Sequence, residues 1–193
     1  MQSRFNHSSR GFSLTEMLVV IALIGVLSLI SVPAFINMKN QSTFKGDLQN
    51  FAHDLRAARQ YAITQTVDVR VELSPAPGNQ LTSNRYRFFW SNDRGATWTA
   101  LNMPGGHAAS PGSTGNIKDL TGPVWFQSQT NLTDPDGNGQ PDIVYHPNGS
   151  MDLTPNAPNA QIVMRSAWNN ITYNMYTIGL SGSGQFTSTA GHS

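Results

Sequence analysis

Cysteine is absent from the 193 residues, which excludes a disulfide framework, a thiol nucleophile and a cysteine-based metal site. Charge is also scarce, because charged residues make up 12% of the chain, about half of the roughly 25% usual for soluble domains. After residue 37, ten Lys or Arg balance ten Asp or Glu. The later part of the chain therefore lacks the broad basic surface of a dedicated nucleic-acid binder.

The motifs of common catalytic sites are missing as well. The sequence has no G-x-S-x-G, no P-loop and no H-E-x-x-H, and its five histidines are scattered. We therefore expect a non-enzymatic protein that requires no cofactor. Frequent glycine (17) and proline (11) favour a loop-rich β domain instead.

No charged residue occurs between Met17 and Ile36. Twenty helical residues span about 30 Å, the thickness of the hydrocarbon core of a bilayer. The run also lacks the polar face that a soluble helix would show. Residues 1–11 before it contain two arginines and no acid. The sequence therefore predicts a short basic leader and one membrane-spanning helix, with a larger domain beyond it.

One acid, Glu16, stands directly before this apolar run, where a carboxylate needs a partner such as a free amino terminus. Residues 11–16, GFSLTE, together with the run, resemble the processing motif of type IV prepilins. In that family a membrane peptidase cuts after the glycine and methylates the new terminal residue. The resemblance makes Gly11 the last leader residue and Phe12 the methylated terminus. It makes Glu16 the carboxylate that neutralises a neighbouring subunit's amine during filament assembly, and Pro33 the site of a helix kink.

An ordinary secretory signal peptide is the alternative interpretation of this end. Val32, Pro33 and Ala34 resemble the small residues that precede signal-peptidase cleavage, which would leave Phe35 as the first residue. Glu16 and the length of the apolar run argue against it, since signal peptides have shorter apolar regions.

The pattern after Pro33 becomes amphipathic and then alternating. One helical stripe consists of Phe44, Leu48, Phe51, Leu55, Ala58 and Ala62. From Val67 onward a period of two predicts a half-buried strand whose polar face carries Asp68, Arg70 and Glu72. A hairpin of residues 85–90 and 97–101 follows, and further strands are expected near residues 124–127, 143–145, 150–153, 161–165, 171–180 and 184–187.

The expected fold class is α+β and pilin-like: a long, kinked N-terminal helix packs on a small antiparallel β domain. We expect a leader at residues 1–11, a transmembrane and assembly helix at 12–36, its amphipathic continuation at 37–66 and an extracytoplasmic β-rich domain at 67–193.

The predicted hairpin turn, residues 91–98, reads SNDRGATW and resembles the Asp-box of sialidases. One copy in a chain too short for a propeller favours a structural role. We expect Asp93 to bond the turn backbone, Gly95 to adopt a positive φ and Trp98 to cover the turn.

An acidic loop at residues 134–142 reads DPDGNGQPD and resembles a Ca²⁺ loop. The candidate ligands are Asp134, Asp136, Asn138 and Asp142. Tyr145 stands where an EF-hand has its bidentate glutamate, so a complete EF-hand is excluded. An ordinary exposed loop is the competing interpretation.

The order of kinked helix, VDVRVEL strand, aromatic hairpin and short C-terminal strands is similar to GspH/FimT-type minor pilins and pseudopilins. The resemblance implies a filament subunit at or near the tip of a type IV pilus or type II secretion system. Its partners would be other pilin subunits, the prepilin peptidase and the inner-membrane assembly platform. It would lie in the inner membrane with its domain in the periplasm, and later in the filament.

A binding module, either an adhesin or a DNA-uptake receptor, is the second functional class. Some members of the resembled family bind DNA through a Gly-Arg-x-Arg stretch, but residues 184–187 contain no arginine. The remaining candidate patch consists of Arg85, Arg87 and Arg94 with an exposed Phe89.

Overall fold

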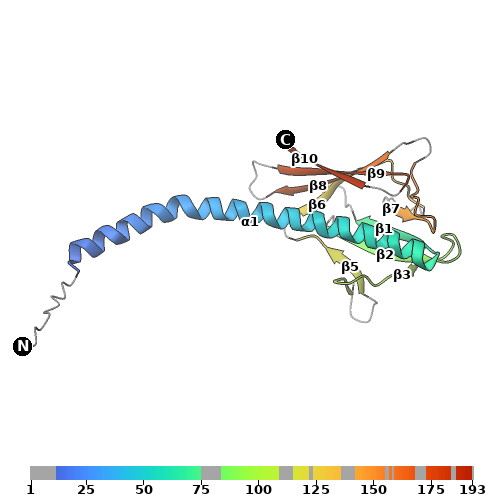
Figure 1. Ribbon diagram of the computed structural model, residues 1–193, viewed down its shortest axis with the longest axis horizontal. Coiled ribbons are helices and arrows are strands. Elements are labelled where there is room, and N and C mark those ends of the chain that lie inside the picture. Colours follow the sequence, from blue (N-terminus) through green and yellow to red (C-terminus); the bar gives the residue numbers. More distant parts are fainter. Residues whose placement is uncertain are drawn as a thin grey trace, which may run out of the picture. The chain divides into compact units, whose positions relative to one another are not determined.

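The computed structural model describes residues 12–74, 84–108, 115–121, 124–135, 142–154, 157, 159–167, 173–183 and 186–192. A single helix, α1 (Leu14–Gln65), precedes the strands β1 to β10 (Figure 1). The chain divides into two compact units, residues 1–41 and 42–193, and α1 contributes to both. The α+β prediction of a long N-terminal helix and antiparallel sheets is confirmed.

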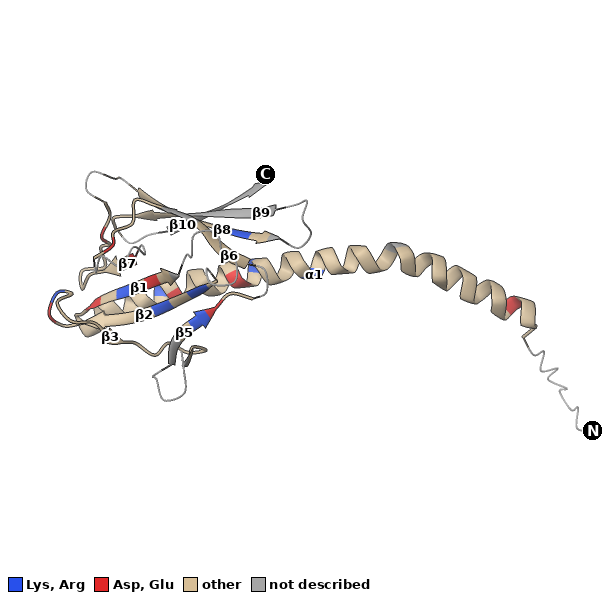
Figure 2. Cartoon of the chain, turned by 180° about the vertical axis from the view of Figure 1, so that it is seen from behind, with Lys and Arg blue, Asp and Glu red and all other residues tan. Residues whose placement is uncertain are grey.

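Helix α1 runs without a break through Pro33 and ends in a left-handed residue. Thr66 has a φ of 55°, and the N–H of Val67 donates to the carbonyl of Ala62 at 3.1 Å. This is the Schellman pattern, here with threonine where glycine is usual. In the first part of the helix, charge is confined to one acidic position near its start (Figure 2).

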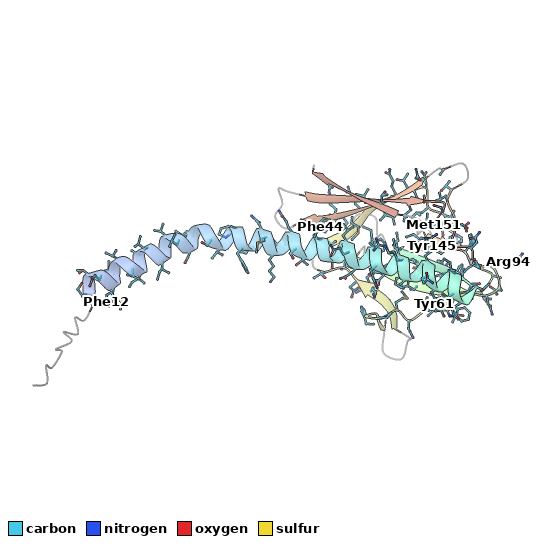
Figure 3. The ribbon with its side chains drawn as sticks, viewed as in Figure 1. Phe12, Phe44, Tyr61, Arg94, Tyr145 and Met151 are labelled. Atoms are coloured by element: carbon cyan, nitrogen blue, oxygen red, sulfur yellow. The ribbon has the colours of Figure 1, made fainter. Side chains whose placement is uncertain are left out.

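The first sheet is antiparallel and contains six strands. Its order is β4 (His107–Ala108), β5 (Gly115–Asp119), β2 (Arg85–Ser91), β1 (Asp68–Ser74) and β7 (Asp142–Tyr145), and β3 (Thr99–Ala100) pairs with β2. The predicted hairpin corresponds to β2 and β3, and Arg94 lies at the tip of its turn (Figure 3). Strands β4 and β5 were not predicted, because residues 107–119 lack a clear apolar alternation.

The second sheet contains four antiparallel strands. Its order is β10 (Phe186–His192), β9 (Tyr173–Ser181), β8 (Asn159–Ala167) and β6 (Val124–Thr130). The prediction of a strand at residues 150–153 is wrong. Within it, Met151 makes only an isolated bridge with Tyr145, and its N–H donates to the carbonyl of Gly182 at 2.9 Å. This segment thus connects the two sheets instead of extending either one.

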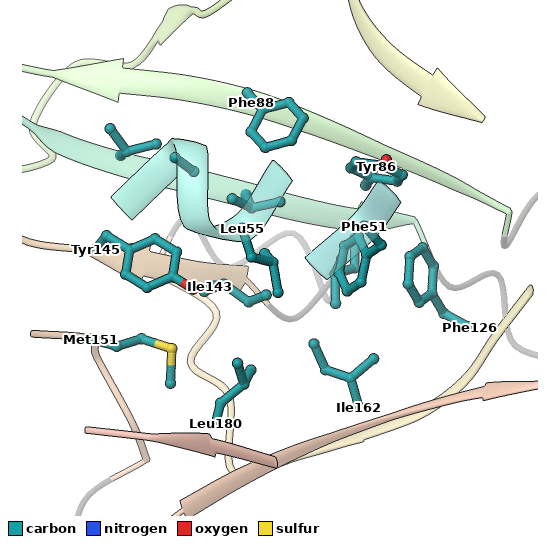
Figure 4. Packing of buried hydrophobic residues seen from close by; sticks show 14 of the residues in the cluster. Phe51, Leu55, Tyr86, Phe88, Phe126, Ile143, Tyr145, Met151, Ile162 and Leu180 are labelled. Carbon is teal, nitrogen blue, oxygen red and sulfur yellow. The ribbon is translucent and has the colours of Figure 1, made fainter. Parts of the chain in front are cut away.

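The predicted helical stripe forms the centre of the core in residues 42–193. All six of its residues are buried, and Phe51 is fully buried. The centre of the Phe51 ring lies 5.0 Å from that of Tyr86 on β2 and 5.1 Å from that of Phe126 on β6 (Figure 4). The helix therefore packs against both sheets, and the amphipathic pattern after Pro33 is confirmed.

The prediction that β1 exposes its polar face is wrong. Asp68, Arg70 and Glu72 are all buried, with exposures of 7%, 5% and 2%. Arg70 approaches the carboxylates of Glu72 (3.8 Å) and Asp142 (3.5 Å), and Arg87 forms an ion pair with Glu72. The buried charges of Arg70 and Glu72 thus have partners of opposite sign, which offsets part of the cost of burying them.

Candidate functional site

The amino end of α1 begins with a reciprocal cap. The backbone N–H of Ser13 donates to Oε2 of Glu16 at 3.0 Å, and the backbone N–H of Glu16 donates to Oγ of Ser13 at 3.2 Å. The Ser13 hydroxyl donates to the same Oε2 at 3.1 Å. This is a capping box, which satisfies backbone donors that the first helical turn leaves without partners.

The cap places the two predicted functional residues at one helix end. Phe12 is 75% exposed and directly precedes Ser13, and Glu16 is exposed in the first turn. Of the two carboxylate oxygens of Glu16, only Oε2 accepts a hydrogen bond from the described residues. Its Oε1 is therefore open to a donor from another molecule. Gly11, the predicted last leader residue, lies outside the described residues.

The helix behind this cap has an apolar surface on all sides. Every described large apolar side chain from Phe12 to Met38 is exposed, and the side chains point outward in all directions (Figure 3). An 18-residue window of the helix reaches a mean hydropathy of 2.7, and none of it is buried. Length and composition suit a membrane span. Such a surface needs lipid or other apolar helices as its surroundings.

Pro33 lies inside this segment without ending it. Because proline has no N–H, the carbonyl of Leu29 loses its partner four residues further along the helix. The predicted kink position is therefore a local weakness in a continuous helix.

Two of the three arginines of the predicted DNA patch are ion-paired, and DNA binding by this patch stays a prediction. Arg85 pairs with Asp119 at 3.0 Å, and Arg87 pairs with Glu72. Arg94 lies in the turn after β2, and about 20 Å of strand separates it from Arg85. The predicted exposure of Phe89 is also wrong, since its ring is half-buried and the Arg70 guanidinium lies 4.7 Å from its centre.

The calcium loop is described only at its two ends. Asp134 is exposed, while Asp142 is fully buried and faces Arg70. Asp136 and Asn138 lie outside the described residues. Calcium binding by this loop stays a prediction, and Asp142 has a structural partner of its own.

The Asp-box turn has the predicted structural features. Oδ1 of Asp93 accepts a hydrogen bond from the N–H of Thr97 at 2.9 Å, and Oδ2 accepts one from its hydroxyl at 2.6 Å. Hydrogen bonds from Ser91 and Thr97 lower the pKa of Asp93 to about 2. Gly95 has a φ of 84°, and a Cβ there would lie 3.1 Å from the ring of Trp98. The described motif therefore forms a hydrogen-bonded turn that Trp98 contacts.

Sequence reasoning missed three polar groupings. The capping box was visible as S-x-x-E at residues 13–16. A histidine bridge, in which His146 contacts Asp68 (2.7 Å) and Asp152 (2.8 Å), has no local signature. The third grouping lines a cavity beside β5, and it too depends on residues far apart in the sequence.

Comparison with known proteins supports the interpretation of both parts of the chain. The model of the prokaryotic N-terminal methylation motif matches residues 6–32, and that of type II transport protein GspH matches residues 47–184. Over 40 residues, or 21% of this chain, the sequence is 48% identical to type IV major pilin protein PilA of Myxococcus xanthus (strain DK1622). That match spans 18% of the relative's length.

A crystal structure of the type IV minor pilin FimU of Pseudomonas aeruginosa (strain PAO1) is similar with a TM-score of 0.43 at 10% sequence identity. The similarity covers 76% of this chain and 96% of that one. The family assignment depends on the sequence models, of which the GspH model covers more than half of the chain. The chain is a type IV prepilin-like protein, and it belongs to the family of type II transport protein GspH.

Proposed function

We propose that this chain is a minor pilin or pseudopilin that works at or near the tip of a type IV pilus or type II secretion filament. One observation carries the filament role in this proposal: an apolar helix surface, exposed on all sides, directly follows a capped Glu16 whose Oε1 accepts no hydrogen bond from the described residues. Such a surface fits lipid before assembly and neighbouring helices after it.

Processing by a prepilin peptidase would cut between Gly11 and Phe12 and methylate Phe12. The new amine of one subunit would then meet the Glu16 carboxylate of another, since an ion pair lowers the cost of placing either charge at an apolar surface. The helix of residues 12–36 would hold the subunit in the inner membrane, with the later residues in the periplasm. An assembly platform would move it into the filament.

The experiment is an assembly assay with three variants of the full chain. Glu16→Ala should abolish incorporation into sheared filaments, and Glu16→Gln should do the same because it keeps the shape but removes the charge. Gln49→Ala, on the exposed side of the same helix, should leave incorporation unchanged. Incorporation of Glu16→Gln at the wild-type level would contradict the proposed role of the carboxylate.

A further inference from the structure

A cavity of about 410 Å³ lies in the unit of residues 42–193, between α1 and the region of β5. The helix contributes Asp47, Asn50 and Asp54 to its wall, and the other side includes Lys118 and Thr121. In Figure 2, acidic positions on α1 and a basic position on β5 are coloured in this part of the fold, and both elements contribute residues to the cavity wall. The volume lies within the usual range of ligand pockets, and the wall carries charge of both signs.

Two of the acidic residues in the wall already have counter-ions. The Nζ of Lys118 donates to both carboxylate oxygens of Asp54 at 2.8 and 2.7 Å, and the hydroxyl of Tyr86 donates to Oδ2 at 2.8 Å. Asp119 pairs with Arg85 at 3.0 Å, and His107 lies 2.7 Å from its Oδ2. These charges cancel within the chain.

Asp47 is different, although it is about as buried as Asp54. It is 7% exposed, and its oxygens accept hydrogen bonds from the N–H (2.7 Å) and the hydroxyl (2.8 Å) of Thr121. Among the ion pairs of the described residues, none includes Asp47. Burial raises the pKa of this carboxyl group, against the opposing effect of the Thr121 hydrogen bonds.

Within the described residues, the cavity wall thus carries one negative charge without a counter-ion. Burial of a carboxylate in this state is unfavourable, and a matching cation offsets the cost once it enters with good geometry. Asn50 and His53 line the same cavity, and the His53 side chain is 79% exposed. The missing charge is therefore a single positive one, and a donor group can reach it from solvent.

We propose that this cavity receives the lysine or arginine side chain of a neighbouring filament subunit, with Asp47 as its counter-ion. The proposal rests on the filament role proposed above. A basic side chain supplies one positive charge and several N–H donors, which match the carboxylate of Asp47 and the amide oxygen of Asn50. Docking here would fix the neighbour against α1 at a defined height along the helix.

The binding chemistry can be tested without assembly, on the full chain in detergent micelles. The probe is N-acetyl-argininamide, and N-acetyl-citrullinamide is its uncharged match of the same shape. The amide resonance of Thr121 reports binding, because its N–H donates to Asp47. We expect a saturable shift with the arginine probe alone, and a dissociation constant at least about tenfold higher in Asp47→Asn.

Asp47→Asn keeps an oxygen that can accept from Thr121, so it removes the charge with little change of shape. Gln49→Ala, exposed on the same helix, should bind the probe like the wild type. An equal shift with the citrulline probe, or unchanged affinity in Asp47→Asn, would overturn the proposal. If a monovalent or divalent cation at physiological concentration displaced the arginine probe, the cavity would be the site of a free cation. That result would also overturn the proposal.

The neighbour is identified by a photo-reactive p-benzoylphenylalanine placed at Asn50 in assembled filaments. We expect an adduct to a filament subunit beside one of its lysines or arginines, and at least a severalfold loss of that adduct when Asp47→Asn is added. Filaments that still depend on Glu16 but give no such adduct would overturn this inference and leave the filament role intact. Filament yield that does not depend on Glu16 would instead overturn the filament role, and the neighbouring-subunit proposal with it.

Discussion

Oε2 of Glu16 accepts two hydrogen bonds from Ser13, one from the backbone N–H at 3.0 Å and one from the hydroxyl at 3.1 Å. The acid that the prepilin motif assigns to assembly is therefore also the N3 residue of a capping box. The cap holds the carboxylate at the helix end through one oxygen, and the other oxygen accepts no hydrogen bond from the described residues. We infer that Ser13 orients Glu16 before a neighbouring amine arrives.

Removal of the cap should loosen the first helical turn without abolishing assembly. Ser13→Ala deletes the hydroxyl that accepts from the N–H of Glu16, at an expected cost of about 1 kcal/mol. Hydrogen exchange of the amides of residues 13–17 in micelles would measure it. Ser28→Ala is the control, because the Ser28 hydroxyl bonds the Ile24 carbonyl within the helix and caps nothing. Equal exchange in the two variants would contradict the capping role.

Phe51 should be among the residues whose truncation costs most stability. It is fully buried and contacts aromatic rings of both sheets, so Phe51→Ala should lower the free energy of unfolding by about 3–5 kcal/mol. Chemical denaturation of the full chain in micelles, followed by tryptophan fluorescence, would measure the loss. Ile63→Ala, on a residue that is 40% exposed, should cost much less. Similar losses in both would mean that the helix does not pack between the sheets.

Two buried tyrosines should respond oppositely to loss of the hydroxyl group. Tyr86 donates to Asp54 at 2.8 Å, so Tyr86→Phe should cost about 1–3 kcal/mol of unfolding free energy. The hydroxyl of Tyr145 is buried without a hydrogen-bond partner in the described structure, and burial raises its pKa. Tyr145→Phe should therefore be neutral or stabilising by up to about 1 kcal/mol. The same denaturation assay compares them, and a large loss in Tyr145→Phe would indicate an ordered partner.

His146 should make the stability of residues 42–193 depend on pH. Burial acts to lower its pKa, but hydrogen bonds to Asp152 and Asp68 and their negative charges outweigh this and raise it above 6.5. The folded state therefore binds the proton more tightly than the unfolded state. The stabilisation is complete below pH 6.5 and is lost as the pH rises through the raised pKa.

The measurement is the midpoint of denaturation between about pH 6 and pH 9, where histidine titration falls. The wild type should lose stability over this range, and His146→Asn should show a much flatter dependence. His53→Asn is the matched control, because the His53 side chain is 79% exposed. An unchanged slope in His146→Asn would assign the dependence to another group.

The sequence predicted those parts of the fold that depend on local periodicity. The stripe from Phe44 to Ala62 gave the buried helix face, because a period of 3.6 places these residues on one side. It could not show that Arg70 and Asp142, 72 positions apart, approach within 3.5 Å. That long-range pair gives the buried Arg70 a counter-ion, whereas the alternating pattern by itself predicts that Arg70 is exposed.

The candidate functional residues also fall into those that the sequence predicted and those that it did not. Phe12, Glu16 and Pro33 could be predicted because they lie close together in the sequence, at the spacing of the prepilin motif. The cavity around Asp47 could not be predicted from the sequence. Asp47 and Thr121 meet only when β5 and its flanking segment pack beside α1. DNA binding by the predicted arginine patch stays a prediction. Its sequence pattern did not show that Arg85 and Arg87 are each paired with a carboxylate from another strand.

The identity of the mature amino terminus tests the central claim most directly. Mass spectrometry of the protein from membranes or sheared filaments would determine it. The proposed function predicts a terminal peptide that begins with N-methylated Phe12, with Glu16 as its fifth residue. A peptide that begins at Phe35 would contradict it, because the membrane helix and Glu16 would then have been removed with an ordinary signal peptide.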